Sequence, residues 1–176
     1  MLKFFTYSFL AGTISAFICF LFFITEFALN VNPLGASKAF GYVIMFAMFF
    51  PALWYFREKH LGGKIHFPQG FLFGSLVNFF ACLFYSFLIG FYLAQINPQV
   101  LENHKQESKM FITSMKEDYL KTMNVNDFEQ GLVSLQQISV GDIMWDELYK
   151  RFFILLIFVV IAAFIMRRTH YNEEKI

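Results

Sequence analysis

Four long apolar runs dominate the sequence and restrict the folds open to it. They cover roughly residues 4–24, 39–56, 71–96 and 152–166. A helix needs about 20 apolar residues, within a range of about 17–25, to cross the hydrocarbon core of a bilayer. The first three runs meet this requirement, and Trp145, Leu148 and Tyr149 lengthen the fourth at its start. The sequence therefore predicts an all-α polytopic membrane protein with four transmembrane helices.

The composition and the cysteines agree with lipid as the solvent. Only 15% of the residues are charged, whereas soluble domains carry about 25%. The first run follows Lys3, but it is longer than a signal-peptide core and no A-x-A-like cleavage site follows, so we expect an uncleaved helix. Cys19 and Cys82 lie inside apolar runs, where they are expected to act as small hydrophobes and not as a disulfide. The net charge of +1 gives no reason to expect a nucleic-acid partner.

Basic residues set the expected orientation, because lysine and arginine concentrate in short loops on the cytoplasmic side. Their density is highest near the two termini and in the loop between the second and third runs. We expect these residues to fix the topology and to contact anionic headgroups: Arg57, Lys59, Lys64, Arg167 and Arg168. The prediction is a multi-pass membrane protein with both termini in the cytoplasm, although Lys150 and Arg151 depart from the pattern.

The chain is expected to form one structural unit with three parts. Residues 1–96 hold three transmembrane helices, 97–149 an extracytoplasmic helical segment, and 150–176 the fourth helix and a short basic tail. In the middle part, Asn97 and Pro98 predict the start of a helix of about 25 residues. Asn126, with Glu129 three residues later, predicts the start of a second helix, and Asp142 is expected to cap the last one.

Both extracytoplasmic helices are amphipathic and present an apolar face. The face consists of Phe111, Met115, Tyr119, Met123, Phe128, Leu132, Leu135 and Ile138. Such helices either cap the bundle or lie in the membrane interface, or they dock a partner protein. An excess of acidic residues argues against simple adhesion to anionic lipid. This face is the candidate docking surface.

A row of small and short polar residues runs along the third helix at four-residue spacing. The row comprises Gly70, Gly74, Asn78, Cys82, Ser86, Gly90 and Ala94, and the first helix has a shorter row at Ser8, Gly12 and Ala16. Small residues at this spacing let helices approach closely inside lipid. We expect the first and third helices to touch along these rows. The rows serve either packing within one chain or a homo-oligomer interface or lipid groove.

Few residues in the apolar runs could carry chemistry. Glu26 near the end of the first run is either a solvated helix end or a proton relay. His60 and His66 flank the turn at Gly62 and Gly63, but their spacing is a poor metal pattern. The glycines are expected to supply left-handed backbone, and Pro51 is expected to kink the second helix. The sequence thus predicts no catalytic residues, no cofactor and no metal.

The stretch "HLGGKIHFPQGFLFG" resembles the junction of the second and third helices in the domain-of-unknown-function 4199 family. The later "INPQVLE" and the amphipathic stretch before the last helix resemble it too. The resemblance covers nearly the whole chain and implies a small bacterial membrane protein with four helices. It implies no activity and no site residues.

Two function hypotheses remain, with a third less supported. The first is a non-enzymatic accessory or scaffold subunit that docks another membrane or envelope protein. The second is a small oligomeric transporter or lipid-handling protein, and the third is an intramembrane enzyme. The expected partners are the bilayer and another membrane protein or a second copy of the chain.

Overall fold

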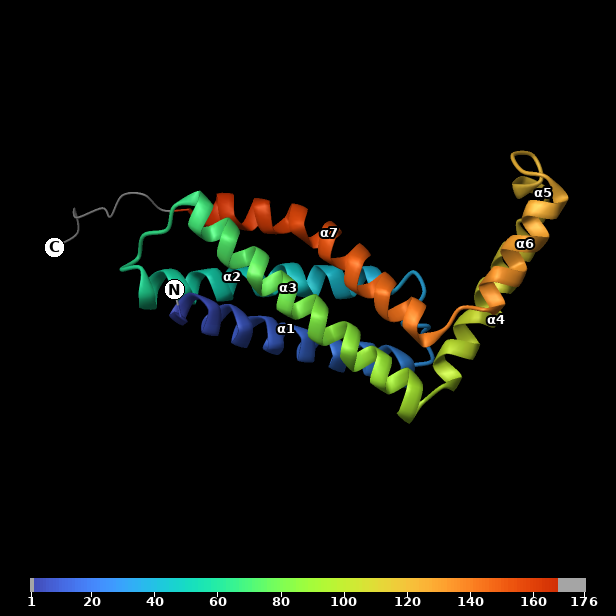
Figure 1. Ribbon diagram of the computed structural model, residues 1–176, viewed down its shortest axis with the longest axis horizontal. Coiled ribbons are helices and arrows are strands. Elements are labelled where there is room, and N and C mark those ends of the chain that lie inside the picture. The colour runs from blue at the N-terminus through green and yellow to red at the C-terminus, as the bar shows by residue number, and fades with distance from the viewer. Residues whose placement is uncertain (1, 168–176) are drawn as a thin grey trace.

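The computed structural model describes residues 2–167, and it is a bundle of long helices with a helical hairpin at one end (Figure 1). The elements in chain order are α1 (Leu2–Ala28), α2 (Lys38–His60), α3 (Phe67–Phe91), the π-helical turn η1 (Tyr92–Ile96), α4 (Gln99–Ser114), α5 (Lys116–Tyr119), α6 (Val125–Gln136) and α7 (Val140–Met166). The predicted all-α architecture is confirmed.

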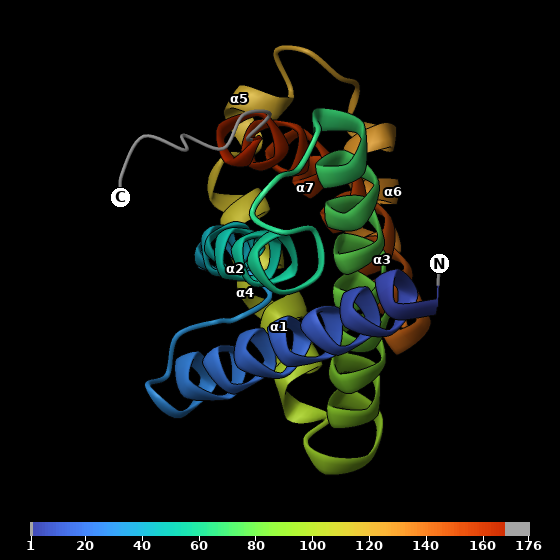
Figure 2. The ribbon, with the colours of Figure 1, turned by 90° about the vertical axis from the view of Figure 1, so that its left-hand side faces the viewer.

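Four helices in the described chain are long and apolar enough to cross a membrane: α1, α2, α7, and α3 continued through η1. They run antiparallel, so that the start of α1, the α2–α3 loop and the end of α7 meet at one end (Figure 1). We call this the terminal end and the opposite one the hairpin end. α3 is the most buried of the four, with α1 and α7 packed along it (Figure 2). The prediction of four transmembrane helices is confirmed.

The lipid-facing surface is apolar and is bordered by aromatic residues. Large side chains such as Phe17, Phe87 and Phe153 are more than half exposed on the bundle, as expected where lipid replaces water. At the hairpin end Trp145 and Tyr149 are exposed and stack with their ring centroids 5.3 Å apart. Tryptophan and tyrosine favour the membrane–water interface, so this pair marks one edge of the hydrocarbon.

Several helix boundaries differ from those expected. α7 begins at Val140, not near residue 150, because Ser139 and Asp142 form a reciprocal capping box. Residues 140–149 are therefore the first turns of the fourth long helix, and Asp142 lies inside it. Asn124, not Asn126, caps α6 by accepting a hydrogen bond from the Asp127 N–H at 2.8 Å. The helix expected over about 25 residues ends at Ser114.

Two glycines shape the turn between α2 and α3, and the proline in α2 does not end that helix. Gly62 and Gly63 have φ values of +59° and +79°, which confirms the expected left-handed backbone. α2 continues through Pro51 to His60. The backbone N–H of His66 then donates to Gln69 Oε1 at 3.2 Å as α3 begins.

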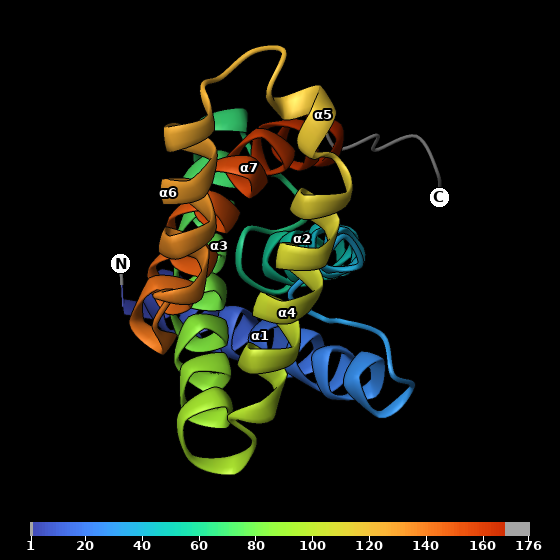
Figure 3. The same ribbon diagram turned by 90° about the vertical axis from the view of Figure 1, so that its right-hand side faces the viewer.

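The hairpin formed by α4, α5 and α6, residues 99–136, runs across the end of the bundle (Figure 3). α4 and α6 pack side by side, and η1 leads from α3 into α4. Phe128 is buried in the hairpin, with its ring 6.2 Å from that of Tyr119. The hairpin thus has a small core of its own outside the four-helix bundle.

Candidate functional site

The small-residue row of α3 is filled by α7 of the same chain. A Cβ added at Gly74 would lie 2.8 Å from Val159 Cγ1, and one added at Gly70 would lie 3.5 Å from Ala163 Cβ. Gly90 lies directly against the Met144 side chain. The glycines therefore permit a close approach of α7 along most of the length of α3.

The polar members of the row hydrogen-bond to the same helix. Asn78 Nδ2 donates to the Phe152 carbonyl at 3.0 Å, and Ser86 Oγ donates to the Met144 carbonyl at 2.7 Å. Cys82 Sγ lies 3.3 Å from Asn78 Oδ1, and Ala94 lies exposed in η1 beyond the seam. Of the two interpretations of this row, packing within one chain is the one that the structure supports.

The first helix touches α3 as expected, but on a different face. A Cβ at Gly12 would lie 2.6 Å from Phe80 Cβ and 2.8 Å from the Val77 carbonyl oxygen. Ser8 and Ala16 are fully buried on either side of Gly12. The expectation that the α1 row and the α3 row pack against each other is therefore wrong, because α7 occupies the latter.

A buried ion pair within α7 is the feature that sequence reasoning missed. Arg151 is fully buried and Glu147 is 3% exposed. The Arg151 Nε and Nη2 atoms donate to Glu147 Oε2 at 3.0 and 2.7 Å. Arg151 lies about 16 Å along α7 from Val140, at about 1.5 Å per residue, which places it deeper in the bundle than Tyr149. Charge at such depth is costly and usually has a structural or functional reason.

Two other helices complete the environment of Arg151. Its guanidinium carbon lies 4.0 Å from the ring centroid of Tyr85 on α3 and 4.6 Å from that of Tyr42 on α2. Gly41 leaves room for it, since a Cβ there would lie 3.1 Å from Nη1. That Nη1 atom has no hydrogen-bond partner among the described residues. Arg151 therefore ties α2, α3 and α7 together through one charged group.

Charged side chains extend this cluster toward the hairpin end. Lys38 Nζ lies 3.7 Å from Glu147 Oε1 and 3.5 Å from Asp146 Oδ2, and Lys150 also pairs with Asp146. Glu26 on α1 is 7% exposed and lies within electrostatic reach of Arg151. The interpretation of Glu26 as a solvated helix end is therefore wrong. The spacing of Glu147 and Arg151, four residues apart on one helix face, was the available signal.

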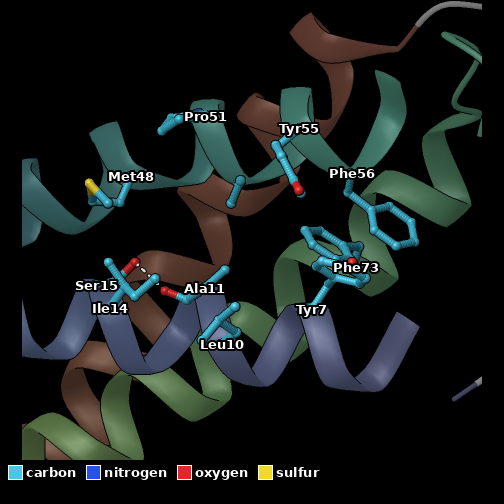
Figure 4. Close-up of a pocket in the computed structure, with 11 residues that line it drawn as sticks. Tyr7, Leu10, Ala11, Ile14, Ser15, Met48, Pro51, Tyr55, Phe56 and Phe73 are labelled. Atoms are coloured by element: carbon cyan, nitrogen blue, oxygen red, sulfur yellow. Dashed lines mark hydrogen bonds between the residues drawn. The ribbon is translucent and has the colours of Figure 1, made fainter. Parts of the chain in front are cut away.

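A pocket opens between α1 and α2 (Figure 4). Its volume is about 290 Å³. It is lined by Tyr7, Leu10, Ala11, Ile14 and Ser15 of α1, Met48, Pro51, Ala52, Tyr55 and Phe56 of α2, and Phe73 of α3. Its only buried hydroxyl, that of Ser15, donates to the Ala11 carbonyl at 2.8 Å, so the pocket wall is almost wholly apolar.

The predicted basic residues lie at the terminal end, and they differ in their contacts. Arg57 pairs with Glu58 at 2.8 Å and donates to the Met166 carbonyl at 3.2 Å, which joins α2 to the end of α7. Lys59 and Lys64 are exposed, and Arg167 lies over the Phe164 ring. Arg168 lies outside the described residues.

The two histidines of this loop do not come together as metal ligands. His60 packs its ring against Tyr7, with centroids 4.2 Å apart, while His66 is exposed at the start of α3. Across residues 2–167, no three histidine, cysteine, aspartate or glutamate side chains gather as a metal site.

The predicted docking face divides between the hairpin interior and its surface. Phe128 is buried inside the hairpin, and Ile138 packs toward the bundle core. Phe111, Met115 and Met123 are exposed, whereas Tyr119, Leu132 and Leu135 are half-buried. Phe111, Tyr119 and Leu135, together with Ile112, line one side of a groove of about 560 Å³, which we call the hairpin groove.

The other side of the hairpin groove is the loop between α1 and α2, lined by Asn32, Gly35 and Ala36. Asn32 also fastens the hairpin to the bundle, because its Nδ2 donates to Glu107 Oε2 at 2.8 Å and to His104 Nδ1 at 3.1 Å. The pKa of His104 is lowered below its usual value, mainly by burial and to a smaller extent by the nearby Lys38 ammonium. The Glu107 carboxylate raises this pKa, but by less. A neutral His104 can accept the Asn32 hydrogen bond.

Comparison with known proteins agrees with the resemblance noted from the loop motif. Residues 10–168, nearly the whole chain, match the family described as "Protein of unknown function (DUF4199)". No curated protein and no solved structure matches the chain. Its four long apolar helices are those of a membrane protein, and the chain belongs to the DUF4199 family.

Proposed function

We propose that this protein is a non-enzymatic accessory subunit that docks another membrane or envelope protein in its hairpin groove. The observation that carries the proposal is the groove itself. Phe111, which lines it, is 60% exposed on a helix that lies outside the bundle. Exposed apolar surface of this kind, rimmed by polar residues, is typical of interaction sites.

The way in which the hairpin is held supports a docking role. The bundle has its own core, and α7 fills the row on α3 that could otherwise have served as an interface. The hairpin meets the bundle through η1, through Val100 and Leu101 in the first turn of α4, and through the Asn32 hydrogen bonds. Beyond this attachment it overhangs the end of the helices (Figure 3). A partner helix or loop can therefore enter between the hairpin and the α1–α2 loop without disturbing the bundle.

The proposal includes an orientation in the bacterial inner membrane. Lys3, Arg57, Lys59, Lys64 and Arg167 all belong to the terminal end, which favours placing that end in the cytoplasm. The hairpin then lies on the outer side, where it meets the extracytoplasmic part of its partner.

A pull-down with matched variants tests the docking role. Tagged protein extracted in a mild detergent retains a membrane or envelope protein, and Leu135→Glu in the groove lowers the amount retained by about tenfold or more. Met123→Glu is the control, because Met123 is an exposed apolar residue of the same hairpin that does not line the groove. Equal retention by both variants, or isolation of the protein alone, contradicts the proposal.

A small oligomeric transporter or lipid-handling protein is the second candidate. The observation that favours it is the apolar pocket between α1 and α2, two helices long and apolar enough to cross a membrane.

A further inference from the structure

We propose that the pocket between α1 and α2 binds one acyl chain of an anionic phospholipid, with the headgroup at the terminal end. The inference stands independently of docking at the hairpin, because the pocket and the hairpin groove share no residue.

The position of the pocket identifies the kind of occupant. α1 and α2 are membrane-spanning helices, and Leu10, Ile14, Pro51 and Tyr55 at the mouth of the pocket are exposed on the bundle surface. The mouth therefore opens into the hydrocarbon layer, where acyl chains are the abundant apolar species. A volume of about 290 Å³ is at the lower end of ligand pockets, which run from about 300 Å³ upward, and suits a part of one chain.

Small residues in α1 and α2 create the space. Ala11 on α1 and Ala52 on α2 both line the pocket among larger side chains. Phe56 and Phe73 stack with centroids 4.3 Å apart at the closed side. An unfilled apolar cavity forfeits dispersion contacts on its lining, and a lipid chain restores them without desolvating any polar group.

The direction of the headgroup follows from the helical periodicity. Tyr7 and Tyr55 are lining residues near the terminal end, and residues four positions further along the same helix faces are Lys3 on α1 and Lys59 on α2. Both lysines are exposed. The start of α1 and the end of α2 lie at the same end of the bundle (Figure 1), so both lysines belong to that end of the seam, where they complement a phosphate.

His60 adds a polar group at this end. Its ring packs 4.2 Å from that of Tyr7, and its Nε2 atom is buried without a hydrogen-bond partner among the described residues. Buried polar atoms are normally paired. His60 thus leaves one unsatisfied polar atom beside Tyr7, a pocket-lining residue, at this end of the seam.

Native mass spectrometry tests the site. The protein is reconstituted in vesicles of equal parts phosphatidylglycerol and phosphatidylcholine, extracted in mild detergent and weighed. We expect one retained phosphatidylglycerol, reduced about tenfold or more by Ala11→Phe. Val160→Phe, on a lipid-exposed face of α7, leaves retention unchanged. Equal retention by wild type and Ala11→Phe overturns the proposal.

Headgroup selection is tested in the same assay. The double variant Lys3→Gln/Lys59→Gln is expected to abolish the preference for phosphatidylglycerol over phosphatidylcholine, while Lys64→Gln in the neighbouring loop preserves it. Equal retention of both lipids by the wild-type protein overturns the assignment of an anionic lipid.

A second measurement uses the unaltered protein, so that it does not depend on the folding of Ala11→Phe. A phospholipid with a diazirine in one acyl chain is photolysed in the reconstituted vesicles, and the modified peptides are mapped. Adducts concentrated in residues 7–15 and 48–56 support the site. An even spread over all lipid-exposed helix faces overturns it.

Discussion

Replacing Arg151 by methionine should destabilise the protein far more than any surface change on the same helix. The guanidinium donates two hydrogen bonds to Glu147 and lies over two tyrosine rings. Removing one partner of a buried ion pair costs about 3–5 kcal/mol, because the other charge stays buried and uncompensated. Lys38 remains 3.7 Å from Glu147, so we expect about 3 kcal/mol, the lower end of this range.

A second substitution, at Glu147, should reverse most of this loss of stability. In Glu147→Leu/Arg151→Met both members of the ion pair are removed, so neither charge is left without its partner, and replacing a buried pair by apolar residues is often neutral or stabilising. The double variant should therefore recover most of the stability lost in Arg151→Met. Lys150→Met is the control on the same helix, since the exposed Lys150–Asp146 pair should contribute less than about 1 kcal/mol.

The free energy of unfolding measured in bicelles by steric trapping distinguishes these outcomes. A loss of about 3 kcal/mol lowers the folded-to-unfolded ratio by a factor of about 100–200, which is well within reach of the method. A stability of Arg151→Met equal to that of Lys150→Met would refute the structural role of the pair. So would a double variant as unstable as the two single changes added together.

Three further predictions concern packing, pH and topology. Gly12→Val should destabilise the bundle by about 2 kcal/mol or more, because its Cβ would meet backbone of α3. Gly131→Ala has nothing within 4 Å of the added Cβ and should stabilise α6 by about 0.5–1 kcal/mol. Thermal unfolding in detergent compares the two variants, and equal effects would contradict the close approach of α1 to α3. Because the pKa of His104 is lowered in the fold, the native state binds fewer protons than the unfolded state as the pH falls from about 7.5 to 5.5. The protection of the hairpin amides, measured as the exchange rate relative to the intrinsic rate at each pH, should therefore decrease on acidification, and unchanged protection would contradict this. Both native cysteines are buried, so a membrane-impermeant maleimide applied to intact cells should label Glu117→Cys but not Lys64→Cys, and the reverse pattern would invert the proposed orientation.

The architecture was predictable because lipid imposes a simple requirement on sequence. Apolar runs of the right length predicted the four spans, and the glycine pair predicted a left-handed turn that the structure contains. The α3 row was also recognisable as a close-packing surface. Its partner was not, since four-residue spacing says that some helix approaches closely but carries no information on which one.

The buried ion pair and the hairpin groove could not be predicted from sequence patterns. The sequence pattern places Glu147 in the extracytoplasmic segment and Arg151 at the outer start of the last helix, because it puts the beginning of that helix too late, beyond the capping box at Ser139. The groove joins Asn32 to Leu135, residues far apart in the chain. Only the tertiary arrangement brings these residues together. Periodicity alone also could not separate the members of the predicted apolar face that are buried inside the hairpin from those that stay exposed.

Photo-crosslinking in intact cells tests the docking role most directly. Tyr119 lines the hairpin groove, and replacing it with photoreactive benzoylphenylalanine keeps an aromatic ring at that position. The account predicts one discrete adduct with a different membrane or envelope protein, and no such adduct when the probe replaces exposed Glu129 on the same hairpin. Adducts with lipid alone, with a second copy of the chain, or with the same proteins at both positions would contradict it.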